Sequence, residues 1–312
     1  MLFIGIYSSN EVSRHMTQIQ NWSGSVRFTP KNLHTPETEA ALIALVKACS
    51  QQNRRIRVIG SGHSFTRLIE TDDVLISLNK LQGIINVDHD THQVTVWGGT
   101  KIKALGKHLA AVDLAQINLG DIDVQSIAGA ISTGTHGSGA ALGSVATQVV
   151  GLRLITASGA VIDCSETENR DIFKAAQVSM GTLGIITQVT LQCMPAYTLD
   201  YHWYKQPLQD VLHNLDKLKQ HRHFEFYWIP HTETTLVKTM NIIDQPAQHK
   251  SLFRRFNENV IENLAFWGFS AAAWQFPWQS KRIARMMSTL ISNGHDVTAS
   301  HETFATVRVV KF

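Results

Sequence analysis

The sequence predicts an α+β protein with mixed sheets, and two kinds of pattern carry this prediction. Continuous or alternating apolar runs joined by short polar turns are typical of strands and β-hairpins. Runs with apolar residues three to four positions apart are typical of helices, and here they do not follow every strand as in a βαβ array. The chain has 312 residues, of which 44% are apolar and 17% charged. A chain of this length has room for about two domains, each with its own core.

The first part of the chain supplies most of these patterns. Residues 38–52 form an amphipathic helical pattern, and short buried strands are expected at 56–60 and 74–78. Three further features follow: a hairpin of 84–87 and 93–99 around the turn 88–91, a helix at 105–112, and a second hairpin at 149–164. A helix at 171–180, a turn at 181–184 and a strand at 185–194 complete this part.

A second unit is expected after Pro195. It contains strands at 225–230 and 234–240 and helical patterns at 251–274 and 281–294, the latter closed by Gly294. We therefore expect an N-terminal extension (1–21), a first domain (22–196) and a second domain (197–312). The residues 301–312 build toward a strand without a polar tail. Because a domain rarely ends on an unpaired apolar strand, we expect the second domain to be incomplete.

Charge and cysteine content exclude some functions. The net charge is only +3 and no run of five Lys or Arg occurs, which argues against a nucleic-acid partner. Cys49, Cys164 and Cys193 are odd in number and widely spaced, so buried reduced thiols in a reducing compartment are expected. No stretch of 18 apolar residues occurs, which predicts a cytoplasmic protein that is at most peripheral on a membrane.

The aromatic segment 266–278 allows two interpretations. Trp267, Trp274 and Trp278, together with nearby phenylalanines, could form a membrane-facing patch. Core packing of the second domain is the favoured interpretation.

Glycine-rich loops are the main candidates for a binding site. Gly60-Ser61-Gly62-His63-Ser64 directly follows a strand, and such a loop can present backbone N–H groups to a pyrophosphate. A Rossmann fingerprint fails because Phe65 stands where a third glycine is needed. Residues 126–144 form a second loop of small and hydroxyl side chains, and residues 181–185 form a third tight turn. Taken alone, the first loop is better explained as a tight structural turn. The alternative for the second is a glycine-rich loop under close packing, which the presence of two such loops in one domain makes the less favoured interpretation.

Together the loops resemble a known family. The blocks RVIGSGHSF (57–65), NLGDI (118–122) with SIAGAISTGTHGSG (126–139), and SMGTLGIIT (179–187) resemble the FAD-linked sugar-1,4-lactone oxidases and the alditol oxidases in order and spacing. HFEFYWIPHT (223–232) resembles the start of the aldonolactone-oxidase substrate domain. The resemblance implies a PCMH-type, two-lobed FAD-binding domain of the vanillyl-alcohol-oxidase superfamily, followed by an incomplete α+β substrate (cap) domain.

The resemblance also implies a role for individual residues. The pyrophosphate would be wrapped by Val58, Ile59, Gly60, Ser61, Gly62, His63 and Ser64; the flavin and its ribityl chain would be lined by Ser126, Gly129, Ser132, Thr133, Gly134 and Thr135, with Gly184 and Ile185 near the other lobe. His63 falls where these oxidases attach the flavin covalently, and a neutral imidazole is a suitable nucleophile. The alternative is a histidine that only forms a hydrogen bond in the loop.

Two residues are implied on the substrate side. Gly120 and Asp121 would lie beside the reactive face of the flavin, with Asp121 near the substrate. In the family a glycine at the position of Gly120 accompanies oxidases, and an alanine accompanies dehydrogenases that use another acceptor. The alternative for Gly120 is a permissive turn conformation.

The implied activity is the oxidation of an aldono-1,4-lactone, such as D-arabinono-1,4-lactone, with O2 as acceptor and H2O2 as product. Alternatives are an alditol oxidase, or a non-catalytic FAD-binding remnant, because the family's substrate-handling Glu and Arg and its late His-Trp-Gly-Lys motif are not found up to Phe312. We therefore expect weak turnover. His136 is expected to be structural or to orient the flavin rather than to act as a base. His89 and His92 are expected in a solvated turn, so no metal is predicted.

Overall fold

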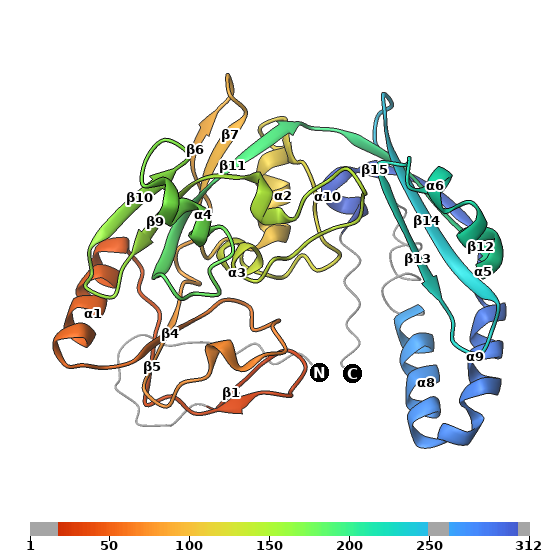
Figure 1. Ribbon diagram of the computed structural model, residues 1–312, viewed down its shortest axis with the longest axis horizontal. Coiled ribbons are helices and arrows are strands. Elements are labelled where there is room, and N and C mark those ends of the chain that lie inside the picture. Colours follow the sequence, from red (N-terminus) through yellow and green to blue (C-terminus); the bar gives the residue numbers. More distant parts are fainter. Residues whose placement is uncertain (1–17, 249–261, 305–312) are drawn as a thin grey trace.

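The computed structural model describes residues 18–248 and 262–304. The chain folds into two lobes followed by a separate cap sheet, and the long strand β11 leads from the second lobe toward the cap (Figure 1). This arrangement confirms the expected α+β class with mixed sheets.

The first lobe is a small parallel sheet covered by one helix. Its strand order is β3-β5-β4. A separate two-stranded sheet, β1-β2, precedes it in the chain. The helix α1 begins after Thr38, whose hydroxyl accepts a hydrogen bond from the N–H of Ala41 (3.1 Å) and so caps the first turn. Its buried face packs on the sheet. The elements are β1 (Ile19–Gln20), β2 (Arg27–Phe28), β3 (Asn32–His34), α1 (Glu39–Gln51), β4 (Ile56–Ile59), η1 (Arg67–Ile69) and β5 (Val74–Ser77).

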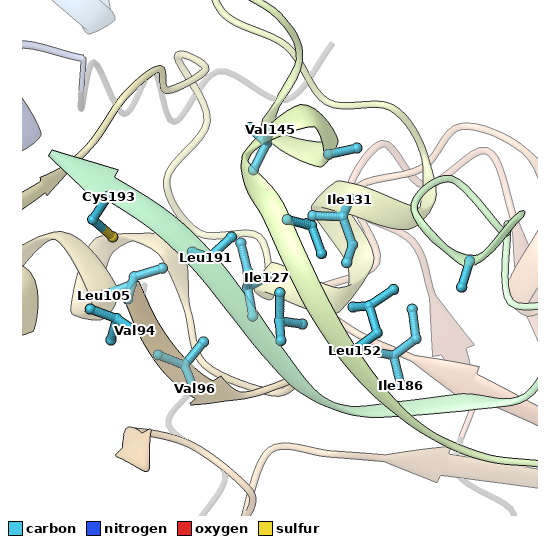
Figure 2. Close-up of a cluster of buried hydrophobic side chains, with 14 of the residues drawn as sticks. Val94, Val96, Leu105, Ile127, Ile131, Val145, Leu152, Ile186, Leu191 and Cys193 are labelled. Carbon is cyan, nitrogen blue, oxygen red and sulfur yellow. The ribbon is translucent and has the colours of Figure 1, made fainter. Parts of the chain in front are cut away.

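The second lobe is an antiparallel sheet of order β10-β9-β11-β7-β6, with β8 paired to the far end of β11. The two predicted hairpins are present as β6-β7 and β9-β10. Helices of this lobe pack against the sheet. Branched aliphatic side chains from the strands and helices form the core between them (Figure 2). The elements are β6 (Ile84–Asp88), β7 (Gln93–Trp97), α2 (Ile102–Ala110), β8 (Leu114–Gln116), α3 (Ile127–Ser132), η2 (Val145–Gln148), β9 (Val149–Ile155), β10 (Val161–Ser165), α4 (Arg170–Ala176) and β11 (Ile185–Pro195).

The cap is a four-stranded antiparallel sheet of order β13-β14-β12-β15. Leu199 and Met240 of this sheet share an apolar cluster with Ile102 and Leu119 of the second lobe, which joins the two units. The elements are β12 (Thr198–Pro207), α5 (Leu208–His213), α6 (Leu215–Leu218), β13 (His223–Trp228), β14 (Thr234–Ile243), α8 (Glu262–Gln275), η4 (Pro277–Gln279), α9 (Ser280–Thr289), β15 (Gly294–Ala299) and α10 (Ser300–Thr303).

The structure corrects two expectations in this part of the chain. Trp267, Trp274 and Trp278 do not pack in a core: they are 55%, 82% and 74% exposed, the first two on α8 and the third on η4. The residues after 300 begin with the helical turn α10 rather than a strand; residues 305–312 lie outside the described part.

Two other expectations can be compared directly. Cys49, Cys164 and Cys193 are all buried and free of disulfide bonds, as expected. In the described ranges 18–248 and 262–304, we find no helix with the length and apolar character needed to cross a membrane.

Candidate functional site

A cavity of about 680 Å³ lies where the two lobes meet. One wall comes from β4, the loop after it and η1 of the first lobe; the other comes from segments 125–133, 155–157 and 180–186 of the second lobe. Its volume is within the range of about 300–1,000 Å³ that is usual for ligand and cofactor sites. Thirteen of the fifteen residues predicted to bind the cofactor line it: Val58, Ile59, Gly60, Ser61, Gly62, His63, Ser64, Ser126, Gly129, Ser132, Thr133, Gly184 and Ile185.

Glycines in this cavity allow its backbone segments to pack closely, within the second lobe and, at Gly60, between the two walls. A Cβ atom on Gly60 would lie 2.3 Å from Oγ of Ser126, and one on Gly129 would lie 2.9 Å from the same oxygen. Gly184 has φ +145° and its Cβ would lie 2.5 Å from the carbonyl oxygen of Ile155. Side chains at these positions would distort the walls, so the glycines leave backbone exposed to an extended ligand.

His63 lies on the cavity wall, and Trp22 of the N-terminal segment packs against its ring. The indole of Trp22 stacks on the imidazole, with ring centroids 5.5 Å apart and 23° between the planes. Burial lowers the pKa of His63 below its ordinary value, and the charge of Lys101 lowers it further. The imidazole is therefore neutral at physiological pH, which is the state that a nucleophilic or hydrogen-bonding role requires.

Lys101 is a functional candidate that the sequence reading missed. It precedes the first turn of α2, and its Nζ donates a hydrogen bond to Oγ of Ser61 (2.8 Å) in the glycine loop. That hydroxyl in turn donates to the carbonyl oxygen of Val124. Burial lowers the pKa of Lys101. A cation beside this loop suits an anionic ligand group such as a pyrophosphate.

The remaining two predicted cofactor residues lie outside the cavity lining. Gly134, with φ +69°, follows the end of α3. The hydroxyl of Thr135 accepts a hydrogen bond from Nε2 of Gln125 (3.1 Å), and Gln125 itself lines the cavity. Their predicted contact with the flavin stays a prediction.

Gly120 and Asp121 also lie outside that lining. Gly120 is buried and does not have a positive φ, so the alternative of a permissive turn conformation finds no support. Instead, a Cβ on Gly120 would lie 2.9 Å from the carbonyl oxygen of His136 and 3.3 Å from Cγ2 of Thr135. The close approach of this neighbouring loop is the structural reason for a glycine here.

Asp121 takes part in a polar cluster that bridges the second lobe and the cap. The hydroxyl of Tyr227 on β13 lies 3.3 Å from Oδ2 of Asp121 and 3.4 Å from Oε2 of Glu225. Nζ of Lys238 on β14 forms an ion pair with Glu225 (2.9 Å) and lies 4.8 Å from the centre of the Tyr227 ring. These four groups supply donors and acceptors of both charge signs at the junction of the two units.

His136 lies apart from these groups. It is exposed, and its Nδ1 lies 3.1 Å from the carbonyl oxygen of Gly137. It does not line the cavity, so its expected flavin-orienting role stays a prediction.

Comparison with known proteins adds two family matches. Residues 30–165 match a family described as an FAD binding domain, and residues 189–312 match a family described as D-arabinono-1,4-lactone oxidase. The L-gulono-1,4-lactone dehydrogenase of Mycobacterium tuberculosis is 38% identical over 293 residues, which cover 94% of this chain and 68% of that protein. The chain belongs to the family of FAD-linked aldonolactone oxidases and dehydrogenases.

Other members of the family are longer than the matched region. The L-gulonolactone oxidase of Mus musculus is 38% identical over 221 residues, and that of Scyliorhinus torazame is 35% identical over 235. These matches cover 70% and 75% of this chain but only 50% and 53% of the relatives. The chain thus spans about half the length of these curated relatives.

Solved structures confirm the fold. Cholesterol oxidase from Brevibacterium sterolicum superimposes with a TM-score of 0.75 at 21% identity, covering 87% of this chain and 56% of that one. At this identity the likeness is one of fold alone, and the fold is the expected PCMH-type FAD-binding architecture. The two glycine-lined walls, Lys101 at the loop and neutral His63 fit the FAD that this domain binds.

Part of the site had no clear signal in the sequence. Gln125 lines the cavity, but its segment carries no glycine pattern. Gly98 and Gly99 also line the cavity, and Lys101 comes two positions after Gly99. The pair at the end of a strand, followed by a helix start, is the signal that could have pointed to Lys101.

Proposed function

We propose that the chain binds FAD covalently through His63 and serves the oxidation of an aldono-1,4-lactone, such as D-arabinono-1,4-lactone. The observation that carries this proposal is the cavity between the lobes, which brings the three glycine loops and His63 to one site. When bound, FAD supplies the two-electron oxidation of a carbon that bears a hydroxyl group. The protein's part is to bind and orient both partners.

The polar cluster at the junction suits a substrate rich in hydroxyl groups. Asp121 and Glu225 can accept hydrogen bonds from sugar hydroxyls, and the Tyr227 hydroxyl can donate to substrate oxygens, while the buried Lys238 holds Glu225 through an ion pair. We propose that Asp121 contacts the substrate from this cluster. Alditol hydroxyl groups also donate and accept hydrogen bonds, so the choice of a lactone rests on the match of residues 189–312 to the D-arabinono-1,4-lactone oxidase family.

We further propose O2 as the electron acceptor, with H2O2 as product. Among the relatives, the names include both oxidases and dehydrogenases, so the acceptor requires its own measurement.

Anaerobic reduction of the bound flavin tests the activity without dependence on the acceptor. The FAD-loaded chain is mixed with D-arabinono-1,4-lactone, L-gulono-1,4-lactone or an alditol, and the flavin absorbance is followed. Bleaching by a lactone supports the proposal, whereas bleaching by the alditol alone would favour the alditol oxidase. No bleaching by any of them would favour a flavin-binding protein without this activity.

Matched variants connect the result to the cluster. Asp121→Asn should slow bleaching by the lactone, because a negatively charged acceptor is lost. Asp113→Asn is the control, since Asp113 is exposed at the turn before β8. Air is then admitted, and peroxide formation at the rate of flavin reoxidation would identify O2 as the acceptor.

A further inference from the structure

The outer part of the cap sheet carries a second group of reactive side chains, away from the cavity. Asp200 and His202 are two positions apart on β12 and therefore lie on the same face of the sheet. His295 on β15 is the direct cross-strand partner of His202. The two imidazole rings stack, with centroids 4.3 Å apart and 17° between their planes.

The polar atoms of these three side chains converge. Nε2 of His202 lies 3.1 Å from Oδ2 of Asp200, and Nε2 of His295 lies 2.5 Å from Oδ1. One such atom from each side chain lies within 4.8 Å of the others. Ligands bound to a tetrahedral zinc ion at about 2.0–2.1 Å are roughly 3.3 Å from each other. Both histidine side chains are about half exposed, so small rotations can close the remaining gap.

From this geometry we propose that Asp200, His202 and His295 form a binding site for a divalent transition-metal ion, with Zn²⁺ as the best match. Two imidazoles and one carboxylate are a donor set for zinc and its neighbours in the first transition series. Mg²⁺ and Ca²⁺ prefer oxygen ligands throughout, so they do not fit. Because the site faces solvent, water would complete the coordination.

The charges of the three groups suit a cation. Burial would raise the pKa of the Asp200 carboxyl, but the hydrogen bonds from His295 and His202 outweigh it and hold that pKa below its ordinary value. The carboxylate is therefore ionised at neutral pH. A metal ion would take the place of the Nε2 protons that these histidines donate to Asp200, and each neutral imidazole would then carry its proton on Nδ1. Over residues 18–248 and 262–304, no other group of three His, Cys, Asp or Glu side chains converges in this way.

A bound ion would cross-link β15 to β12. Pairing of the two strands runs only from Thr198↔Ala299 to Trp203↔Gly294, and His202↔His295 lies next to its end. A metal there would cross-link residues 95 positions apart in sequence, which explains why no local spacing indicates the site. The expected effect is a more stable cap sheet, because an ion that binds the folded state raises its stability.

Calorimetric titration of the purified, EDTA-treated and dialysed chain with ZnCl2 tests the site. Zn²⁺ should bind with a stoichiometry of one and raise the Tm of the chain, and Co²⁺ should give visible d–d absorption typical of nitrogen and oxygen ligands. His202→Ala and Asp200→Asn should each weaken binding by at least the roughly tenfold to hundredfold that loss of a supporting contact costs.

The control addresses the other histidines, since the chain has 15 of them. A His89→Ala/His92→Ala variant changes one exposed and one half-buried histidine on the β6–β7 turn and should bind Zn²⁺ like the wild type. The absence of stoichiometric binding would overturn the proposal. Binding that survives His202→Ala and Asp200→Asn, or that is lost in the control, would also overturn it. Because the readout requires neither flavin nor substrate, it is independent of the proposed lactone oxidation.

Discussion

The indole of Trp22 stacks on the imidazole of His63, with ring centroids 5.5 Å apart and 23° between the planes. Two hydrogen bonds to the backbone of the loop add to this contact: the N–H of Trp22 donates to the carbonyl oxygen of Gly62 (2.7 Å), and the side-chain Nδ2 of Asn21 donates to that of Ser64 (3.0 Å). The N-terminal segment thus fixes both the loop and its histidine. Asn21, expected in an extension before the first domain, contacts this loop.

Covalent attachment of FAD through His63 is the first prediction. Flavin fluorescence should migrate with the protein band on a denaturing gel, and His63→Ala should abolish it. Trp22→Ala should lower the attached fraction, because the imidazole loses its stacking partner, whereas Trp22→Phe should keep most of it. The measurement is band fluorescence per mole of protein. Release of the wild-type flavin by acid would disprove attachment.

The second prediction concerns Lys101, whose Nζ lies 2.8 Å from Oγ of Ser61 in the loop expected to bind the pyrophosphate. Lys101→Met should weaken FAD binding roughly tenfold to hundredfold, because a hydrogen bond to a charged group is worth about 1.5–3 kcal/mol. Binding is measured by flavin fluorescence quenching in the His63→Ala background, so that attachment does not hide affinity. Lys107→Met, at an exposed position on the same helix, should bind FAD normally. Equal affinities in the two variants would exclude a role for Lys101.

Local patterns predicted most strands and helices of the FAD-binding domain, because each depends on neighbours in sequence. The hairpin expected from 84–87 and 93–99 and the helix expected at 38–52 are examples. Contacts between distant segments were not predictable in this way. Tyr227 approaches Asp121 across 106 positions, and His295 approaches Asp200 across 95. The short helix α3 was also missed, because its glycine and other small residues are typical of a loop as well as of a helical turn. The exposure of Trp274 was mispredicted because apolarity alone does not say what covers a helix.

The third prediction is a loss of stability in acid that depends on His223. Its side chain is buried, its Nδ1 lies 3.1 Å from the carbonyl oxygen of Ser138, and burial, helped by Arg222, lowers its pKa from 6.5 to about 4. Between pH 6.5 and pH 4, His223 is protonated in the unfolded chain but stays neutral in the folded chain. Folding should therefore lose up to roughly 3 kcal/mol as the pH falls from 6.5 to 4.

Urea unfolding at several pH values checks this dependence. His223→Gln should be less stable at neutral pH but should lose less stability on acidification than the wild type. His213→Gln, at an exposed position of α5, should follow the wild-type profile. Parallel profiles for His223→Gln and wild type would show that another group controls the acid response.

The fourth prediction follows from the exposed aromatic side chains of α8 and η4. Trp274 and Trp278 lie close in sequence to Lys281, Arg282 and Arg285, and residues 264–290 contain no Asp or Glu. Exposed tryptophans beside basic residues are typical of helices that lie in a membrane interface. The chain should therefore sediment with vesicles containing phosphatidylserine, less so at high salt. Trp274→Ser/Trp278→Ser should reduce sedimentation strongly, while Leu212→Ser, at an exposed apolar position of α5, should not. No binding by the wild type would exclude peripheral membrane association through this surface.

The last prediction is that Gly120 controls access of oxygen to the reduced flavin. The family resemblance places it beside the reactive edge of the flavin, where one methyl group is enough to block a small molecule. The structure adds a competing effect, because a Cβ on Gly120 would lie 2.9 Å from the carbonyl oxygen of His136. Gly120→Ala therefore strains the loop as well, and overpacking of this kind costs about 1–3 kcal/mol.

Two readouts separate these effects. The bound flavin is reduced photochemically, air is admitted, and reoxidation is followed for wild type, Gly120→Ala and Gly120→Ala/Thr135→Ser. The double variant removes Cγ2 of Thr135, which lies 3.3 Å from the new Cβ, so it should recover part of the lost Tm. Blockage by the methyl group predicts that reoxidation stays slow in both variants, although both bind FAD like the wild type. If the rate recovers together with the Tm, or never changes, Gly120 serves the packing of the loop, and its identity says nothing about the electron acceptor.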